Sequence, residues 1–168
     1  MHTASLEHII SSLDAAEVRY LIAGGVAVNG HGYLRFTKDL DLYIQLVPEN
    51  LLRALRALEQ IGFRPNLPLT LEEIADPSLR EQWHRDKNMI VVQMWSDLHP
   101  RTPIDIFISE PFDFNSAYSA APRIEMIPGV HARLVPLDQL IGMKLESGRP
   151  QDLIDVDHLR TLRELNDE

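Results

Sequence analysis

The chain has 168 residues, of which 45% are hydrophobic, so it is long enough to bury one core and form one globular domain. It contains no cysteine, which excludes disulfides, zinc–thiolate sites and thiol catalysis. The formal net charge of −9 is opposite in sign to the field of a protein that holds nucleic acid mainly through its phosphates, so any such contact must be local.

The first residues predict an amphipathic helix. Residues 4–17 carry apolar side chains at the spacing of one helical face, at Leu6, Ile9, Ile10 and Leu13. The same stretch has no basic region or long apolar run and contains acidic residues, so it is neither a signal peptide nor a membrane anchor. We therefore expect a cytoplasmic protein that makes no contact with a membrane.

The remaining pattern alternates strands and helices. The expected elements of the first half are a buried strand over 19–23, a turn at Gly24-Gly25, a short helical segment over 26–31, an alternating strand over 40–46 and a helix from Pro48 to about Gln60. The expected elements of the second half are helical segments after Thr70 and Asp76, strands over 89–94 and 104–108, a hairpin of 123–127 with 131–135, and helices that begin at Pro136 and Pro150. This order predicts an α/β (α+β) fold over residues 1–168, with a small mixed central sheet flanked by helices and a helical C-terminal part over 136–165.

Three aspartates stand where strands do not favour them. Asp39 and Asp41 are two residues apart, so a strand would place both carboxylates on one face, with Cα atoms roughly 6–7 Å apart. An Asp-x-Asp by itself is more often a solvated pair near a strand end. However, Asp is disfavoured within strands, and Asp105 lies inside a further apolar run. A two-metal site needs such a third carboxylate from a neighbouring strand, so these residues are the predicted catalytic and metal-binding aspartates.

Gly24-Gly25 lies between the first strand and a short helix. Glycine lets the backbone approach a phosphate closely, and backbone amides there can donate to it. A Gly-Gly pair alone is mostly a turn, and neither the P-loop pattern nor the dinucleotide-binding fingerprint occurs in the chain.

Together these features resemble the nucleotidyltransferase superfamily, which has a DNA polymerase beta-like fold. Its hallmark is a Gly-Gly or Gly-Ser turn, then h-[DE]-h-[DE]-h on a strand and a later h-[DE]-h. The chain reads AGGVAVNGHGYLRFTKDLDLYI and then PIDIFIS. The first stretch further resembles the toxin-like abortive-infection branch (AbiEii-like), in which G-G-x-A…R-x-T-x-D-[IL]-D recurs. A second pattern of that branch, K…R-x-K-D-x-x-D, is matched in GMKLESGRPQDLIDVDHL, except that Gln151 replaces a basic residue.

The resemblance implies a role for each matched residue. The three aspartates would bind Mg²⁺ or Mn²⁺, and Asp105 could help deprotonate an acceptor hydroxyl. The residues implied in binding a nucleoside triphosphate such as ATP are Gly24, Gly25, Arg35, Thr37 and Lys144. Each has a plainer alternative: Thr37 as a turn former, Arg35 as the partner of a carboxylate, and Lys144 as a lysine along a helix side. Supporting ion pairs, rather than direct catalysis, are expected of Arg149, Asp152 and Asp155.

The leading hypothesis is therefore transfer of a nucleoside monophosphate to a hydroxyl of RNA, protein or a small molecule. In the toxin-like branch a cognate antitoxin protein would be a partner. A tRNA acceptor would need a local basic patch, for which the candidates are Arg35, Lys38, Lys144 and Arg149. One alternative is a non-catalytic nucleotide- or partner-binding module, favoured by Gln151 and by the lack of a separate recognition domain. Hydrolysis at the same carboxylates ranks last.

Overall fold

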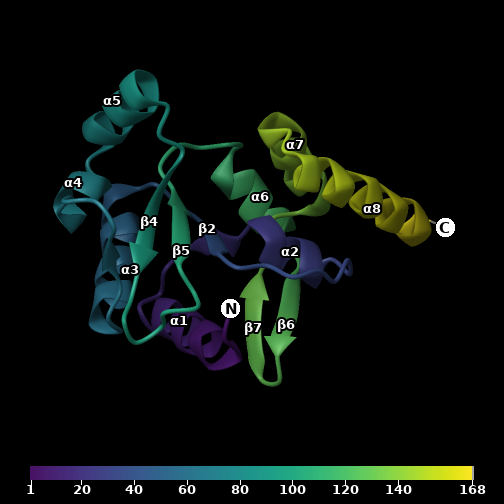
Figure 1. Cartoon of the computed structure of the whole chain (residues 1–168), viewed down its shortest axis with the longest axis horizontal. Helices are drawn as coiled ribbons and strands as arrows, with labels where there is room; N and C mark the ends of the chain where they lie inside the picture. Colours follow the sequence, from purple (N-terminus) through teal and green to yellow (C-terminus); the bar gives the residue numbers. More distant parts are fainter. Residues whose placement is uncertain (168) are drawn as a thin grey trace.

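The protein, described by a computed structural model over residues 1–167, has a five-stranded sheet, a two-stranded hairpin and surrounding helices (Figure 1). The helices are α1 (Thr3–Ala15), α2 (Gly24–Gly30), α3 (Pro48–Gln60), α4 (Leu71–Ala75), α5 (Pro77–Lys87), α6 (Phe114–Ala120), α7 (Leu137–Ser147) and α8 (Pro150–Asn166). The strands are β1 (Tyr20–Ile22), β2 (Leu40–Ile44), β3 (Arg64–Pro65), β4 (Val91–Trp95), β5 (Ile104–Phe107), β6 (Arg123–Ile127) and β7 (Val130–Arg133).

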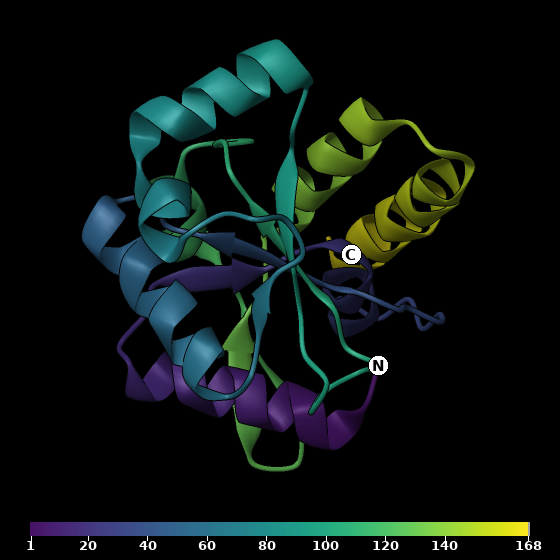
Figure 2. The ribbon, with the colours of Figure 1, turned by 60° about the vertical axis from the view of Figure 1, so that its left-hand side comes forward.

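The central sheet is mixed. Its strand order is β1-β2-β5-β4-β3, in which β2 and β5 are parallel and the other neighbouring pairs are antiparallel. In both views α3, α4 and α5 lie on one side of this sheet, whereas α7 and α8 lie on the other (Figures 1 and 2). The expected α/β (α+β) fold, with a small mixed sheet flanked by helices, is confirmed.

The core forms where the apolar periodicity of the sequence predicted it. All four apolar residues predicted for the face of the first helix are buried, and α1 packs against α3 and β7. Strands β2 and β5 contribute Leu40, Leu42, Ile104 and Ile106, none of which has exposed surface. Burial of side chains of this size typically stabilises a fold by about 1.5–3 kcal/mol each, so this layer fixes the register of the strands that carry the aspartates.

Several helix ends follow from local side-chain chemistry. Thr70 forms the expected capping box, because its hydroxyl accepts from Glu73 N at 3.1 Å while Glu73 Oε2 accepts from Thr70 N at 2.7 Å. Gly148 ends α7 in the left-handed conformation, with a φ of 62°. Two elements were not expected: β3, which is only two residues long, and α6, whose N-cap Asp113 accepts from Ser116 N at 2.8 Å.

Within residues 1–167, no helix combines the length and the apolar character needed to cross a lipid bilayer.

Candidate functional site

Asp41 and Asp105 lie side by side on parallel strands. They are register partners in the β2–β5 pair, flanked by the pairs Leu40–Ile104 and Leu42–Ile106. Neighbouring strands are about 4.8 Å apart and side chains alternate between faces. The buried leucines and isoleucines therefore enter the core, and both carboxylates leave the sheet together on the opposite face.

Asp39 stands directly before β2 and is partly exposed, so the strand itself does not place its side chain. The backbone is nevertheless held here, because Leu40 N donates to Pro103 O at 3.0 Å. The hydroxyl of Thr37 also donates to Asp39 O at 3.4 Å. The sequence predicted that Asp39 and Asp41 share a strand face and that Asp105 comes from a neighbouring strand. The neighbouring strand is as predicted, whereas Asp39 lies in the loop before β2 and its position is not set by strand alternation.

Gly24 allows the backbone at the start of α2 to pack directly against Asp41. Its φ is 59°, and any Cβ at this position would overlap the Asp41 carboxylate. A Cβ on Gly25 would lie 2.5 Å from Thr37 Oγ1 and 3.2 Å from an Arg35 guanidinium nitrogen. The glycine pair therefore brings the start of α2 into contact with the aspartate and with the loop that precedes β2.

The cluster carries more negative charge than its surroundings balance. Burial, followed by the charges of Asp105 and Asp39, raises the pKa of Asp41 from its ordinary value of 3.8 to about 7. Burial also raises the pKa of Asp105, although a hydrogen bond from Gln93 acts in the opposite direction. A cation at this position would relieve the repulsion, and a carboxyl with a raised pKa is suited to accept a proton near neutral pH.

Gln93 is a site residue that the sequence pattern did not single out. It is the register partner of Asp105 across the β4–β5 pair, and its Nε2 donates to Asp105 Oδ1 at 3.0 Å. Asn66 N in turn donates to Gln93 O at 3.0 Å. Gln93 looks like an ordinary polar residue in a strand, and only the strand pairing shows that it orients the third carboxylate.

The loop that leads into β2 is fastened to α8. Arg35 donates through Nε and Nη2 to the two carboxylate oxygens of Asp155, both at 2.7 Å. Asn29 accepts from Arg35 N and donates to Arg35 O, both at 3.0 Å. Tyr33 stacks on His158 with ring centroids 3.8 Å apart. Arg35 is thus used in a bidentate ion pair, which was one of the two roles expected from the sequence.

Lys144 lies inside an ion-pair network between α7 and α8. Its Nζ donates to Asp152 Oδ1 and Asp155 Oδ2, each at 2.8 Å, and its side chain is only 8% exposed. Arg149 Nε donates to Asp152 Oδ2 at 2.7 Å. Burial by itself would raise the pKa of Asp152 and of Asp155, but the hydrogen bonds from their basic partners outweigh burial and hold both pKa values below their usual range. The supporting ion pairs expected of Arg149 are therefore present.

The donor chemistry of the aspartates fits a hard divalent cation. Among residues 1–167, however, no three or more His, Asp or Glu side chains already form a cluster that could hold an ion by themselves. Mg²⁺ usually binds through one or two carboxylates and takes its other ligands from water and substrate phosphates. Asp39, Asp41 and Asp105 are the residues that would hold such an ion when a triphosphate completes its coordination.

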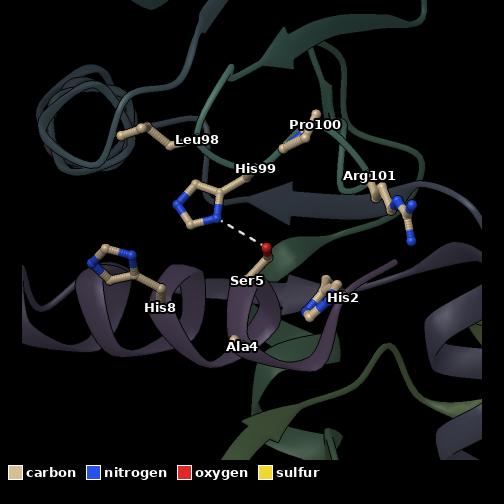
Figure 3. Close-up of a pocket in the computed structure, with 8 residues that line it drawn as sticks. All are labelled: His2, Ala4, Ser5, His8, Leu98, His99, Pro100 and Arg101. Carbon is tan, nitrogen blue, oxygen red and sulfur yellow. Dashed lines mark hydrogen bonds between the residues drawn. The ribbon is translucent and has the colours of Figure 1, made fainter.

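A separate hollow of about 600 Å³ lies between α1 and the turn that joins β4 to β5 (Figure 3). His99 Nδ1 and Ser5 Oγ form a hydrogen bond of 2.9 Å, and the centroids of the His99 and His8 rings are 5.3 Å apart. Burial, with a smaller contribution from His8, lowers the pKa of His99. None of the three aspartates lines this hollow, and its contacts join α1 to the turn between β4 and β5.

The fold is similar to those of several solved structures. No protein-family model and no curated protein matches the sequence. Among solved structures, the lincosamide antibiotic adenylyltransferase LnuA bound to lincomycin superposes with a TM-score of 0.63 at 12% identity, over 96% of this chain and 98% of that one. ANT(2")-Ia in complex with adenylyl-2"-tobramycin superposes with a TM-score of 0.58 at 15% identity, over 96% and 94%. The chain has a nucleotidyltransferase fold.

A third match is an antigenic nucleotidyltransferase-like protein from Paracoccidioides brasiliensis, with a TM-score of 0.56 at 15% identity, over 96% of this chain and 75% of that one. At these identities the likeness concerns the nucleotidyltransferase fold and not the chemistry of any residue. The expectation of a nucleotidyltransferase fold is confirmed. None of these three matches is described as a toxin, so the toxin-like branch stays a prediction.

Proposed function

We propose that the protein transfers a nucleoside monophosphate from a nucleoside triphosphate to a hydroxyl group, in a reaction that depends on Mg²⁺ or Mn²⁺. The observation that carries this proposal is the in-register pair of Asp41 and Asp105 beside Gly24, on a nucleotidyltransferase fold. A bound divalent cation would supply neutralisation of the triphosphate and of the charge on the leaving group.

The residues of the site have separate roles in the proposed reaction. Asp39 and Asp41 would hold the cation, and Gly24 and Gly25 let the backbone at the start of α2 approach Asp41 and Thr37 closely. Asp105, oriented by Gln93, takes the proton of the acceptor hydroxyl. The hydroxyl oxygen forms a bond to the α-phosphorus while the bond from that phosphorus to the bridging oxygen breaks, and pyrophosphate leaves.

The acceptor that best fits the surface is a small molecule. Of the four basic residues expected to form a patch for tRNA, Arg35 is paired with Asp155 and Lys144 is buried, so Lys38 and Arg149 are the exposed ones. Two exposed charges are few for a phosphate backbone on a chain of net charge −9. LnuA and ANT(2")-Ia, whose structures contain lincomycin and adenylyl-2"-tobramycin, provide precedent for such acceptors on this fold.

Radiolabelled nucleoside triphosphates test the proposal directly. The protein is incubated with Mg²⁺, each α-³²P-labelled triphosphate and a cell extract divided into small-molecule, RNA and protein fractions. We expect a labelled product in the small-molecule fraction that Asp39→Ala and Asp41→Ala abolish. Equal labelling by these variants would contradict the assignment of the site, and label confined to RNA or protein would contradict the proposed acceptor class.

Calorimetry separates an enzyme from a non-catalytic module of the same fold. An enzyme of this kind must bind a triphosphate in the presence of Mg²⁺ and lose that binding when EDTA is added. Mg²⁺-dependent binding without any labelled product in any fraction would favour the non-catalytic module instead.

A role as a toxin with a cognate antitoxin is a second candidate, supported by one structural observation. Arg35 belongs to the first sequence pattern that resembles the abortive-infection branch, and Asp155 belongs to the second. These two residues are 120 positions apart in the chain, yet a bidentate ion pair joins them. Growth arrest on expression of the wild type, but not of Asp41→Ala, would support this role. Unimpaired growth with active protein in the cell would contradict it.

A further inference from the structure

The basic residues near the aspartates differ in how free they are to bind a phosphate. Lys144 directs its ammonium to two carboxylates and is almost completely buried. Arg35 uses Nε and Nη2 for Asp155 and Nη1 for Phe36 O, and its side chain is 18% exposed. Binding a phosphate through either residue would require breaking short ion pairs in a buried setting, which is strongly unfavourable.

Arg149 is in the opposite situation. Its side chain is 74% exposed, and within residues 1–167 its hydrogen bond to the protein is made by Nε, to Asp152 Oδ2. The two Nη groups make no hydrogen bond to another described residue and retain four N–H donors between them. This end of the guanidinium has the fork geometry that binds phosphate oxygens in a bidentate manner.

Arg149 is also linked to the aspartates through packed residues of the site. A continuous set of contacts leads from the aspartates to Arg149. It runs from Asp41 through Gly24-Gly25 to Arg35, and then through Asp155, Lys144 and Asp152.

We propose that Arg149 binds the phosphates of the donor nucleotide through its free Nη groups, and that Lys144 is a buried structural counter-ion. Asp152 acts as a positioning residue, because it holds Arg149 through Nε and is itself held by Lys144. This inference rests on the proposed function and identifies which cation of the site faces the triphosphate.

Arginine-to-glutamine variants test this assignment by calorimetry. Binding of ATP, GTP, CTP and UTP is measured with Mg²⁺, and the triphosphate that the wild type binds is then used for Arg149→Gln. Because a charge-assisted contact is lost, we expect the Kd to rise by about tenfold to a hundredfold. Arg149→Lys keeps the charge without the fork and should give an intermediate Kd.

Arg163→Gln is the matched control. Arg163 lies on α8, is 45% exposed and pairs with one carboxylate, Asp138, at 2.9 Å. This variant should bind the triphosphate like the wild type. The melting temperature of Arg149→Gln should stay within about 2 °C of the wild type, because Lys144 still neutralises the buried Asp152 carboxylate.

The outcomes separate this inference from the proposed function. If the wild type binds no triphosphate in the presence of Mg²⁺, the proposed function and the role of Arg149 both fail. If the wild type binds and Arg149→Gln binds equally well, the role of Arg149 is wrong and the proposed function stands. If Arg149→Gln melts well below the wild type, and Arg149→Lys restores the melting temperature fully but the affinity only in part, the nucleotide contact holds. If Arg149→Lys restores the melting temperature and the affinity equally, Arg149 is a structural residue.

Discussion

Asp41 is expected to destabilise the fold whenever it is ionised and no cation is bound. Burial and the charges of Asp105 and Asp39 raise its pKa from 3.8 to about 7. At about 1.36 kcal/mol per pH unit, this difference corresponds to about 4 kcal/mol once the carboxylate is charged. Side-chain relaxation and water entry reduce such costs, so we expect Asp41→Asn to increase the free energy of unfolding by about 2 kcal/mol.

The sign of the pH dependence follows from proton binding. The native state holds the Asp41 proton more tightly than the unfolded chain does, because its pKa is raised on folding. The stability of the wild type should therefore fall as the pH rises from about 4 to about 7, and the full cost should be present above pH 7. In Asp41→Asn this contribution is absent at every pH.

Urea unfolding in EDTA at pH 5 and pH 8 measures this effect. Asp41→Asn should be more stable than the wild type at pH 8, and most of the difference should disappear at pH 5. Asp157→Asn, which removes an exposed carboxylate from α8, is the control and should change stability little at either pH. If Asp41→Asn is no more stable than the wild type at pH 8, the ionised Asp41 carboxylate does not destabilise the fold.

The greater stability of Asp41→Asn should be accompanied by loss of function. Asp41→Asn should lose Mg²⁺-dependent triphosphate binding, because an amide oxygen is a weaker ligand for a hard cation than a carboxylate. Greater stability with lost binding would mark Asp41 as a residue kept for its chemistry at a cost to the fold.

Three further predictions concern the framework of the site. Gly24→Ala should destabilise the protein by about 2–4 kcal/mol, because its φ is 59° and a Cβ would overlap the neighbouring aspartate. Gly142 lies in α7, and a Cβ there would meet open space. Gly142→Ala should therefore stabilise the protein by about 1 kcal/mol. If urea unfolding gave the same change in stability for Gly24→Ala and Gly142→Ala, this contrast would be wrong. Lys144→Met should cost about 3–5 kcal/mol, since it leaves two buried carboxylates without their ammonium partner, and a loss below about 1 kcal/mol would show that the network is not needed. The low pKa values of Asp152 and Asp155 mean that the native state releases these protons more readily than the unfolded chain does. Their contribution should be complete above about pH 4 and lost at lower pH, so acid titration of Asp155→Asn should show a shallower loss of stability than the wild type.

The aspartates and the glycine turn could be found from the sequence because each departs from a local rule. Asp41 and Asp105 interrupt apolar strand runs, and the two-residue period of a strand predicts that they lie opposite the core face. Gly24 follows a buried strand, where only a residue that tolerates a positive φ could make the turn. Helix ends such as the Thr70–Glu73 capping box are equally local, since both partners lie within one helical turn.

The partners of the charged residues were decided only by the tertiary structure. Lys144 fits a phosphate-binding lysine as well as a structural one in the sequence, and its burial between α7 and α8 favours the structural role. Gln93 carries no signal until the β4–β5 register places it opposite Asp105.

Local sequence thus determined the elements and the chemically unusual residues, because capping, strand alternation and glycine conformations act over a few residues. The strand order, the pairing of Arg35 with Asp155 and the exposure of Arg149 depend on segments that are far apart in the chain. The packing of the helices on the sheet determines which carboxylate neutralises which cation. That packing minimises the free energy of the whole chain, so no single stretch of sequence records it.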